Sequence, residues 1–485
     1  MAIQQNIPII FVPGTSGTSL DTGLPFSSEF KGDQHTFPDI CLTCPAGSST
    51  HGDEVFQYNP ASADLAGPRI WIGPEAIGDI LAEQVIANRG SHYFDVLKFD
   101  DSGYNTLSPQ IGAGSVLKQV NLVAHLSNPS NPIYDSLINF LTNDPTGPRR
   151  PLNASSNGLY LFPYDWRLDL SDQVQQLSAF IDGVLQIPDV QNNNIQKVAI
   201  LTHSLGGLIA RAYYLSSPAN EAKVDQVISI AGGFGGGLLP LKILTMGDNW
   251  GIDVGIGPIK IGLAEWEVQE MAQNWGTTYC QLPNSDLWFA DDINRGGTFD
   301  RSYIRDNRQA IPLTYSDSMA WLQLNYNAII CNRTESFFTD PSRPAMGDFT
   351  RGTGNIPHHR IISKGITTTV VAMQISIGQS NLCQYLTKLG LPVPPGEAAP
   401  ITRYNVITGD GDGTIPYHGL LGSLAPGDDR VYLLDNVDHF GITARADVHT
   451  LIQELLNGTV TSQTQVSNIF QSPFDATVHE LSESN

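Results

Sequence analysis

The sequence predicts an α/β fold: a mostly parallel sheet with helices on both faces and a large inserted cap. Three observations support this. Short apolar runs recur along the chain, helical patterns follow several of them, and residues 234–400 break the alternation with a stretch rich in glycine, proline, asparagine and aromatic residues. At 485 residues the chain exceeds one ordinary domain, which fits a single core carrying a cap.

The first predicted elements alternate as strand, strand, helix. Residues 7–12 ("IPIIFV") form an apolar run stopped by Pro13-Gly14, a pattern typical of a buried strand followed by a turn. Residues 158–166 ("GLYLFPYDW") give a second strand. In the following segment, Val174, Leu177 and Ile181 keep helical spacing after Ser171, a plausible cap.

The later core elements continue this alternation. Residues 197–202 predict a buried strand, then a sharp turn and a helix, and residues from 225 ("DQVISIAGG") predict another strand. Two more core strands are expected at 403–409 ("RYNVITG") and 430–435 ("RVYLLD"). The last helix is expected over 442–456, ending at Asn457-Gly458.

We therefore predict four parts. Residues 1–233 form the first part of the core, with a lid-like insertion at about 18–92. Residues 234–400 form the cap, residues 401–460 complete the core, and residues 461–485 are a polar tail. No internal repeat is visible.

Composition excludes some classes of function. The net charge is −22, which would repel nucleic acids and strongly anionic membranes, and the simplest explanation of this charge is a solvated surface. The N-terminal stretch "MAIQQNIPIIFVPG" has neither a basic start nor a small-residue cleavage site, so we expect no signal peptide. The charge-free apolar run 226–241 contains Pro240 and fits a buried strand and loop better than a membrane span.

The five cysteines predict neither a disulfide scaffold nor a metal centre. Cys41 and Cys44 form a lone C-x-x-C without a second pair at zinc spacing, so a local disulfide or plain thiols are favoured over a metal site. No cofactor is predicted.

Ser204 in "THSLGG" is the predicted nucleophile. It lies between a buried strand and a helix, where a tight turn would project its hydroxyl above the sheet and the helix start would direct N–H groups at a developing anion. Thr202 replaces the first glycine of the G-x-S-x-G pattern. The alternative is a purely structural turn.

A serine hydroxyl needs a base, and His439 is the predicted one. It follows a strand and precedes the last helix, in the chain order Ser, acid, His. His203 adjoins Ser204 in sequence but is expected to pack, because adjacent side chains on a turn diverge. The alternative for His439 is a capping histidine.

The acid is expected in "GDGDGTIP", after the strand at 403–409. Asp412 is the predicted partner of the histidine, and Asp410 is expected to cap the turn, although the reverse assignment stays open. A calcium loop is disfavoured because Ile415, Pro416 and Tyr417 stand where further oxygen ligands would be needed. The predicted oxyanion donors are the N–H groups of Leu205 and Thr15.

These stretches resemble the lecithin:cholesterol acyltransferase family of the α/β-hydrolase superfamily, which includes lysosomal phospholipase A and phospholipid:diacylglycerol acyltransferase. The matching pieces are "PIIFVPGTSG", "FPYDWRLD", "LTHSLGGL", "GDGDGTIP" and "DHF", and "PYDWR" is the most specific of them. The resemblance implies an α/β-hydrolase core. It also implies that Asp165, Trp166 and Arg167 support the floor of the site, although a strand-end polar cluster is the alternative.

The resemblance implies a serine-dependent lipid acyl-ester hydrolase or acyltransferase, with Ser204, Asp412 and His439 in the family's catalytic roles. The expected partners are a lipid or other ester substrate and a transient lipid surface. Two alternatives stay open. A carboxylesterase could act on a non-lipid ester if the cap reshapes the pocket, and an inactive binding protein could use the same scaffold.

Overall fold

The structure is a computed structural model. It describes residues 7–22, 69–71, 97–104, 111–116, 119–120, 131–142, 158–248, 253–256, 259–262, 265–283, 304–306, 315–340, 346, 348, 356–378, 386–389, 391–393, 401–422 and 430–460. Most of the insertion expected at 18–92, all of the tail at 461–485, and Cys41, Cys44 and Cys383 lie outside these ranges.

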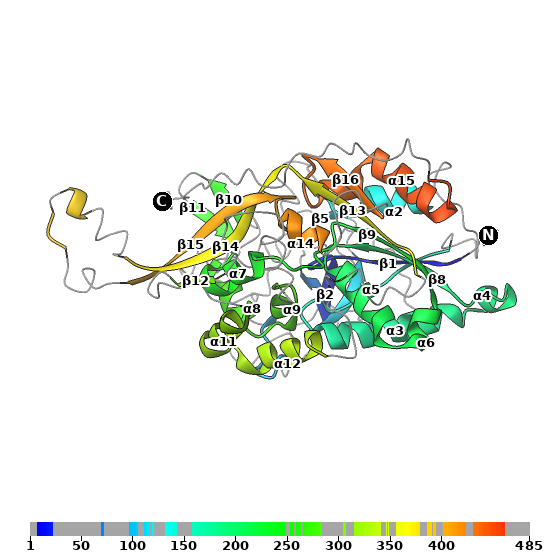
Figure 1. The fold of residues 1–485 in the computed structure, drawn as a ribbon, viewed down its shortest axis with the longest axis horizontal. Coiled ribbons are helices and arrows are strands. Elements are labelled where there is room, and N and C mark those ends of the chain that lie inside the picture. The colour runs from blue at the N-terminus through cyan, green and yellow to red at the C-terminus, as the bar shows by residue number, and fades with distance from the viewer. Residues whose placement is uncertain are drawn as a thin grey trace, which may run out of the picture.

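A six-stranded parallel sheet forms the core (Figure 1). Its strand order is β16-β13-β9-β8-β1-β7, and every neighbouring pair is parallel. The strands are β1 (Ile9–Val12), β7 (Leu159–Leu161), β8 (Val198–His203), β9 (Val224–Ile230), β13 (His358–Lys364) and β16 (Val431–Asp435). The predicted mostly parallel core sheet is therefore confirmed.

Helices cover both faces of this sheet. In Figure 1, α2 (Asp135–Thr142) and α15 (Ala446–Asn457) lie above it, with η3 (Gly441–Ala444) just before α15, and α3 (Leu170–Leu185), α5 (Leu205–Ser216) and α6 (Pro218–Ala222) lie below. Side chains alternate along β1, so Ile10 and Val12 join one core cluster and Ile9 and Phe11 join the other. This two-sided burial explains why β1 is an unbroken apolar run.

The last helix ends close to where the sequence places it. α15 stops at Asn457, and Gly458 adopts the left-handed conformation (φ 63°) that closes the helix through N–H contacts with Glu454 and Leu455 carbonyls. The expected start at 442 is instead a short 3-10 turn, and α15 proper begins four residues later. The first long helix, α3, has Asp169 rather than Ser171 at its N-cap.

Four of the described helices contribute to a separate apolar cluster. They are α7 (Leu239–Met246), α9 (Gly276–Cys280), α11 (Tyr315–Asn325) and α12 (Ala328–Phe338), and they bury residues such as Leu244, Tyr279 and Leu322. The neighbouring α8 (Glu265–Ala272) instead buries Val268 and Met271 in one of the two clusters that pack on the sheet. A short hairpin of β10 (Asp253–Ile256) and β11 (Ile259–Gly262) belongs to the same stretch of chain. The range 234–400 also contains β13, a strand of the central sheet, so not all of this range is cap.

An antiparallel arm extends away from the sheet (Figure 1). β14 (Ile366–Gly378) pairs with β15 (Ile401–Gly411), and β12 (Ile304–Asp306) adds to the edge of β14. The prediction of a core strand at 403–409 is wrong, because β15 belongs to this arm. β13 holds the core position instead. Its sequence "HHRIISK" has only two apolar residues and buries His358 and Arg360, so it lacks the apolar signature of a central strand.

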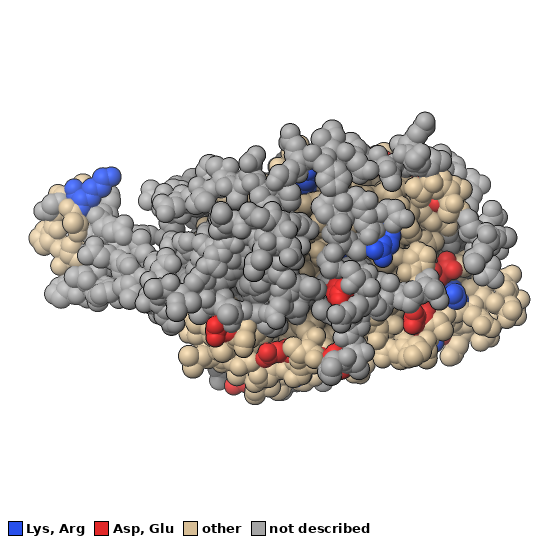
Figure 2. Space-filling model, viewed as in Figure 1, with Lys and Arg blue, Asp and Glu red and all other residues tan. Residues whose placement is uncertain are grey.

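The remaining short elements flank the core. They are β2 (Thr18–Thr22), β3 (Arg69–Trp71), β4 (Ile111–Val116), β5 (Gln119–Val120), β6 (Asn131–Pro132), α4 (Pro188–Asn192) and α14 (Tyr417–Leu421). No helix within the described ranges is long and apolar enough to cross a bilayer. On the face drawn in Figure 2, acidic side chains of described residues are scattered singly, as on a solvated surface.

Candidate active site

Ser204 lies at a sharp turn between β8 and α5. Its backbone has φ 53° and ψ −124°, a conformation that costs free energy for a residue with a Cβ and that clusters at functional sites. The turn packs against the end of β1, since a Cβ at Gly206 would collide with the carbonyl oxygen of Val12. The predicted strand, turn and helix around Ser204 are therefore present.

Thr202 fits this turn because its hydroxyl has a partner. Thr202 Oγ1 lies 2.9 Å from Ser229 Oγ, and that hydroxyl lies 3.0 Å from His358 Nε2. On its other side, His358 Nδ1 lies 3.1 Å from Tyr214 Oη. Complete burial, with nearby arginines, lowers the pKa of His358 well below its usual value, so this histidine is neutral. No sequence motif indicates this buried series of hydrogen bonds from Thr202 to Tyr214.

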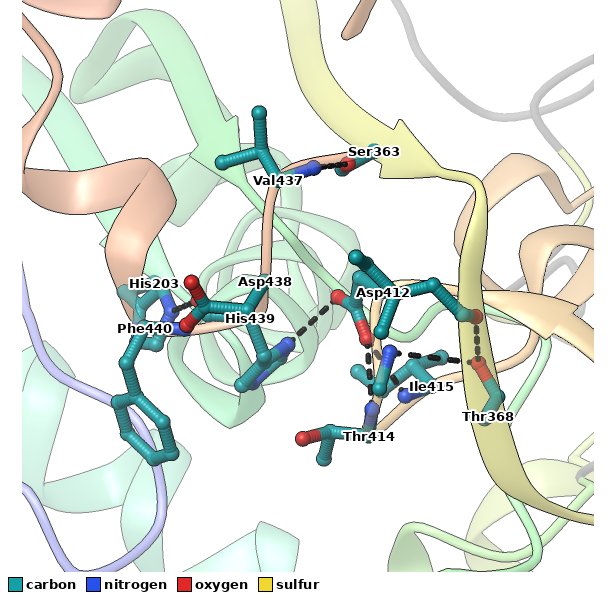
Figure 3. A network of polar contacts seen from close by, with 12 residues as sticks. His203, Ser363, Thr368, Asp412, Thr414, Ile415, Val437, Asp438, His439 and Phe440 are labelled. Carbon is teal, nitrogen blue, oxygen red and sulfur yellow. Dashed lines mark hydrogen bonds and ion pairs between the residues drawn. The ribbon is translucent and has the colours of Figure 1, made fainter. Parts of the chain in front are cut away.

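Asp412 and His439 form a buried pair (Figure 3). Asp412 Oδ2 accepts a hydrogen bond from His439 Nδ1 at 2.6 Å, although the residues are 27 positions apart. Asp412 Oδ1 accepts the N–H groups of Thr414 at 2.9 Å and Ile415 at 2.7 Å. Burial alone would raise the pKa of Asp412, but His439 and these N–H groups outweigh it and hold the pKa below its usual value. Asp412 is therefore ionised.

The protonation of this pair follows from that charge. A carboxylate only accepts, so the proton in the 2.6 Å contact belongs to His439 Nδ1, and Nε2 is the nitrogen that can accept one. The main chain fixes the same pair, because the His439 N–H donates to the Asp412 carbonyl at 2.8 Å. This tautomer suits a general base.

His203 packs between His439 and the turn at Ser204. Its ring centroid lies 4.8 Å from that of His439, and Phe440, which is half exposed, lies edge-on to His439 at 5.4 Å. His203 is itself fully buried, as expected of a packing residue. Its two ring nitrogens contact Tyr134 and the His439 carbonyl.

The loop after β1 carries the predicted oxyanion donor Thr15. A Cβ at Gly14 would lie 2.8 Å from Ser204 Cβ, so the loop passes directly beside the nucleophile turn. The Thr15 hydroxyl donates to Gln281 Oε1 at 3.2 Å, which links the loop to the segment after α9. Leu205, the second predicted donor, is the first residue of α5. Their role as oxyanion donors stays a prediction.

The "PYDWR" segment braces this loop. Tyr164 Oη donates to the Pro13 carbonyl at 2.9 Å, and Trp166 Nε1 donates to the Thr18 carbonyl at 3.2 Å. Arg167 and Asp165 form a two-pronged ion pair with contacts of 2.9 and 2.6 Å, both side chains being nearly inaccessible. These contacts fit structural support of the site and place none of the three side chains at the Asp412–His439 pair.

Asp410 lies outside this pair and closes a different turn. Its Oδ1 accepts the N–H of Gly365 at 2.6 Å, at the junction where β13 passes into β14 and where Gly365 has φ 90°. No group of three or more His, Cys, Asp or Glu side chains within the described ranges could hold a metal ion. Cys280 and Cys331 are buried free thiols.

Comparisons with known proteins agree with the sequence motifs. The family model described as lecithin:cholesterol acyltransferase matches residues 153–372. Phosphatidylcholine-sterol acyltransferase of Gallus gallus is 30% identical over 138 residues, covering 27% of this chain and 30% of the relative. The enzyme of that name from Oryctolagus cuniculus is 26% identical over 133 residues, covering 27% and 28%. The chain thus matches less than a third of the length of these relatives.

Two solved structures are similar at lower identity. The crystal structure of the Tle4–Tli4 complex aligns with a TM-score of 0.44 at 13% identity, covering 93% of this chain and 98% of that one. Bacillus licheniformis lipase BlEst2 in its mature form aligns with a TM-score of 0.31 at 13% identity, covering 66% and 86%. At these scores neither likeness bears on activity.

The resemblance to the lecithin:cholesterol acyltransferase family is therefore confirmed. The matched range 153–372 includes "FPYDWRLD" and "LTHSLGGL" and ends before Asp412 and His439. For those two residues, the geometry of the pair is the independent support.

Proposed function

We propose that this chain, which matches the lecithin:cholesterol acyltransferase family over residues 153–372, is a serine-dependent lipid acyl-ester hydrolase or acyltransferase. Ser204 is the nucleophile, His439 the general base and Asp412 the acid that orients it. The observation that carries the proposal is the buried Asp412–His439 contact of 2.6 Å beside the strained turn at Ser204.

In the first step, Ser204 Oγ attacks the carbonyl carbon of the acyl ester while His439 Nε2 takes the hydroxyl proton. Asp412 stays ionised and stabilises the imidazolium that forms. The carbonyl oxygen becomes an oxyanion, and in this proposal the N–H groups of Leu205 and Thr15 donate hydrogen bonds to it. The intermediate then expels the alcohol, which takes the proton back from His439, and the acyl group remains on Ser204.

In the second step, an acceptor hydroxyl attacks the acyl carbon and His439 takes its proton. The bond from the acyl carbon to Ser204 Oγ then breaks, and Oγ takes the proton back from His439. Water gives a free fatty acid, and an alcohol gives a new ester. The Ser204, Asp412 and His439 chemistry is the same in both cases, so the choice depends on how well the site orients the acceptor or excludes water.

The lipid substrate is supported by the family match and by the "PYDWR" segment, since the elbow and triad alone occur in esterases of many kinds. Half-exposed Phe440, edge-on to His439, offers an apolar surface next to the reacting atoms that suits an acyl chain.

Product analysis on a defined phosphatidylcholine tests this proposal. Vesicles carrying different acyl chains at the two positions are incubated with the protein, with and without a long-chain alcohol. We expect free fatty acid, or a new ester when alcohol is present, and neither with Ser204→Ala. Turnover of short water-soluble esters with none of the phospholipid would instead favour a non-lipid carboxylesterase, and no turnover of either would refute the proposal.

A further inference from the structure

The contacts of His203, the residue before the proposed nucleophile, show which of its ring nitrogens donates and which accepts. Its Nε2 lies 2.8 Å from the His439 carbonyl oxygen, and a carbonyl only accepts, so Nε2 carries the proton. Complete burial and the neighbouring His439 lower the pKa of His203 to about 3, so the ring is neutral and Nδ1 must accept.

His203 Nδ1 accepts its hydrogen bond from Tyr134. Tyr134 Oη lies 2.9 Å from His203 Nδ1 and accepts the N–H of Gly14 at 2.9 Å. Burial raises the pKa of Tyr134 well above its usual value, so the phenol keeps its proton and donates it to Nδ1. The direction of every hydrogen bond is then fixed: Gly14 N–H to Tyr134, Tyr134 O–H to His203, and His203 Nε2–H to the His439 carbonyl.

This series of hydrogen bonds joins two parts of the site that are far apart in sequence. One end is the loop after β1, where Gly14 precedes Thr15. The other end is the main chain of His439, whose N–H is already held by the Asp412 carbonyl at 2.8 Å. The base is therefore held by its side chain, its N–H and its carbonyl, and only the carbonyl contact comes from the residue next to Ser204.

We propose that His203 is a positioning residue that sets the distance between base and nucleophile by holding the His439 main chain against the nucleophile turn. It does this as a neutral hydrogen-bond bridge and transfers no proton to substrate. Through Tyr134 it also fixes the Gly14 N–H, and thereby the loop that carries Thr15. This inference rests on the proposed function of Ser204 and His439.

The neutral tautomer explains why a histidine suits this position. The buried side chain must donate at Nε2, its far nitrogen, and accept at Nδ1, its near one. Glutamine can place an N–H near the Nε2 position and so keep the bond to the His439 carbonyl. Asparagine is shorter and can place an oxygen near the Nδ1 position, so it keeps only the bond to Tyr134.

The test compares His203→Gln with His203→Asn. Active sites are first counted by titration with a fluorophosphonate, and kcat and KM on an ester substrate are then expressed per titrated site. We expect His203→Gln to keep kcat within about threefold and His203→Asn to lose roughly 10- to 100-fold in kcat, with KM nearly unchanged, because a misplaced base slows chemistry rather than binding. Tyr134→Phe should lose roughly tenfold in kcat.

Counting sites separates this role from a purely structural one. If His203 only stabilised the fold, both variants would lose titratable sites and keep kcat per site, which would overturn the proposal. It would also fail if His203→Gln fell as far as His203→Asn. The acidic limb of the pH profile of kcat/KM should survive in His203→Gln, because His203 is not the titrating base. If the wild type showed no titratable Ser204, the proposed function itself would fail instead.

Discussion

Replacing Asp412 with asparagine should disable the base by changing its tautomer. Asp412 Oδ1 accepts two N–H groups, from Thr414 and Ile415. An asparagine must put its carbonyl oxygen there to satisfy them, which turns its amide NH₂ toward His439 Nδ1. His439 Nδ1 must then lose its proton, and the proton moves to Nε2, the nitrogen that should accept from Ser204.

The expected loss is large because the variant has the wrong tautomer and lacks the charge that stabilises the imidazolium. In enzymes with such triads this change costs about 10⁴-fold in kcat, which corresponds to about 5 kcal/mol of activation free energy. Initial rates on an activated ester, per folded molecule, measure it. The loss should be in kcat with little change in KM.

Asp410→Asn is the matched control two residues away. Asp410 accepts a single N–H from Gly365, which an asparagine oxygen can also accept, so we expect a change of less than about threefold. An Asp412→Asn variant that keeps more than a tenth of the wild-type kcat, or an equal loss in both variants, would refute the orienting role of Asp412.

Three further changes test the surroundings of the site. Gly206→Ala should shift the nucleophile turn and lower kcat by roughly 10²-fold, because the added methyl meets a main-chain carbonyl of β1. Arg167→Met should lower the free energy of unfolding by about 3–5 kcal/mol in a urea titration and leave kcat per titrated site nearly unchanged, because it leaves Asp165 buried and unpaired. Burial raises the pKa of Asp169 to about 6 from an ordinary 3.8, so ionising this carboxyl destabilises the folded state. The wild type should therefore lose up to about 3 kcal/mol of unfolding free energy, relative to Asp169→Asn, as the pH rises from about 4 through 6.

Each of these changes has a control. Gly183→Ala adds a methyl where nothing lies within 4 Å and should cost no activity; an equal loss there would show that the effect at Gly206 is not steric. Arg445→Met removes an exposed pair with Asp447 and should cost less than about 1 kcal/mol. A large kcat loss in Arg167→Met would contradict a supporting role, and a flat stability difference between pH 4 and 6 would contradict the buried charge at Asp169.

The elements with a local signature could be predicted from the sequence. β1 is an unbroken apolar run and β8 begins with one, Val198–Leu201, because both faces of these strands are buried. The turn at Ser204 was predictable because a strand, a short turn and a helix follow one another in the sequence. The pairing of Asp412 with His439 was predictable from the chain order serine, acid, histidine. The strand before Asp412 was misassigned, since β15 lies in the arm and not in the central sheet.

The elements that depend on distant partners could not be predicted. β13 contains buried His358 and Arg360, whose polar groups are satisfied by residues far along the chain, so its sequence does not read as a core strand. β15 is a long alternating strand that reads as a core strand but pairs within the arm. Tyr134 has no motif around it. Only the folded contacts with Gly14 and His203 show its place beside the site.

Locating the covalent adduct of a fluorophosphonate probe tests directly whether Ser204 is the nucleophile. The protein is labelled, digested and mapped by mass spectrometry. We expect the adduct on Ser204, no adduct in Ser204→Ala, and labelling at least about 10³-fold slower in His439→Ala, because the hydroxyl then lacks its base. An adduct on another residue, or labelling of Ser204→Ala at the wild-type rate, would contradict the assignment of Ser204 as the nucleophile.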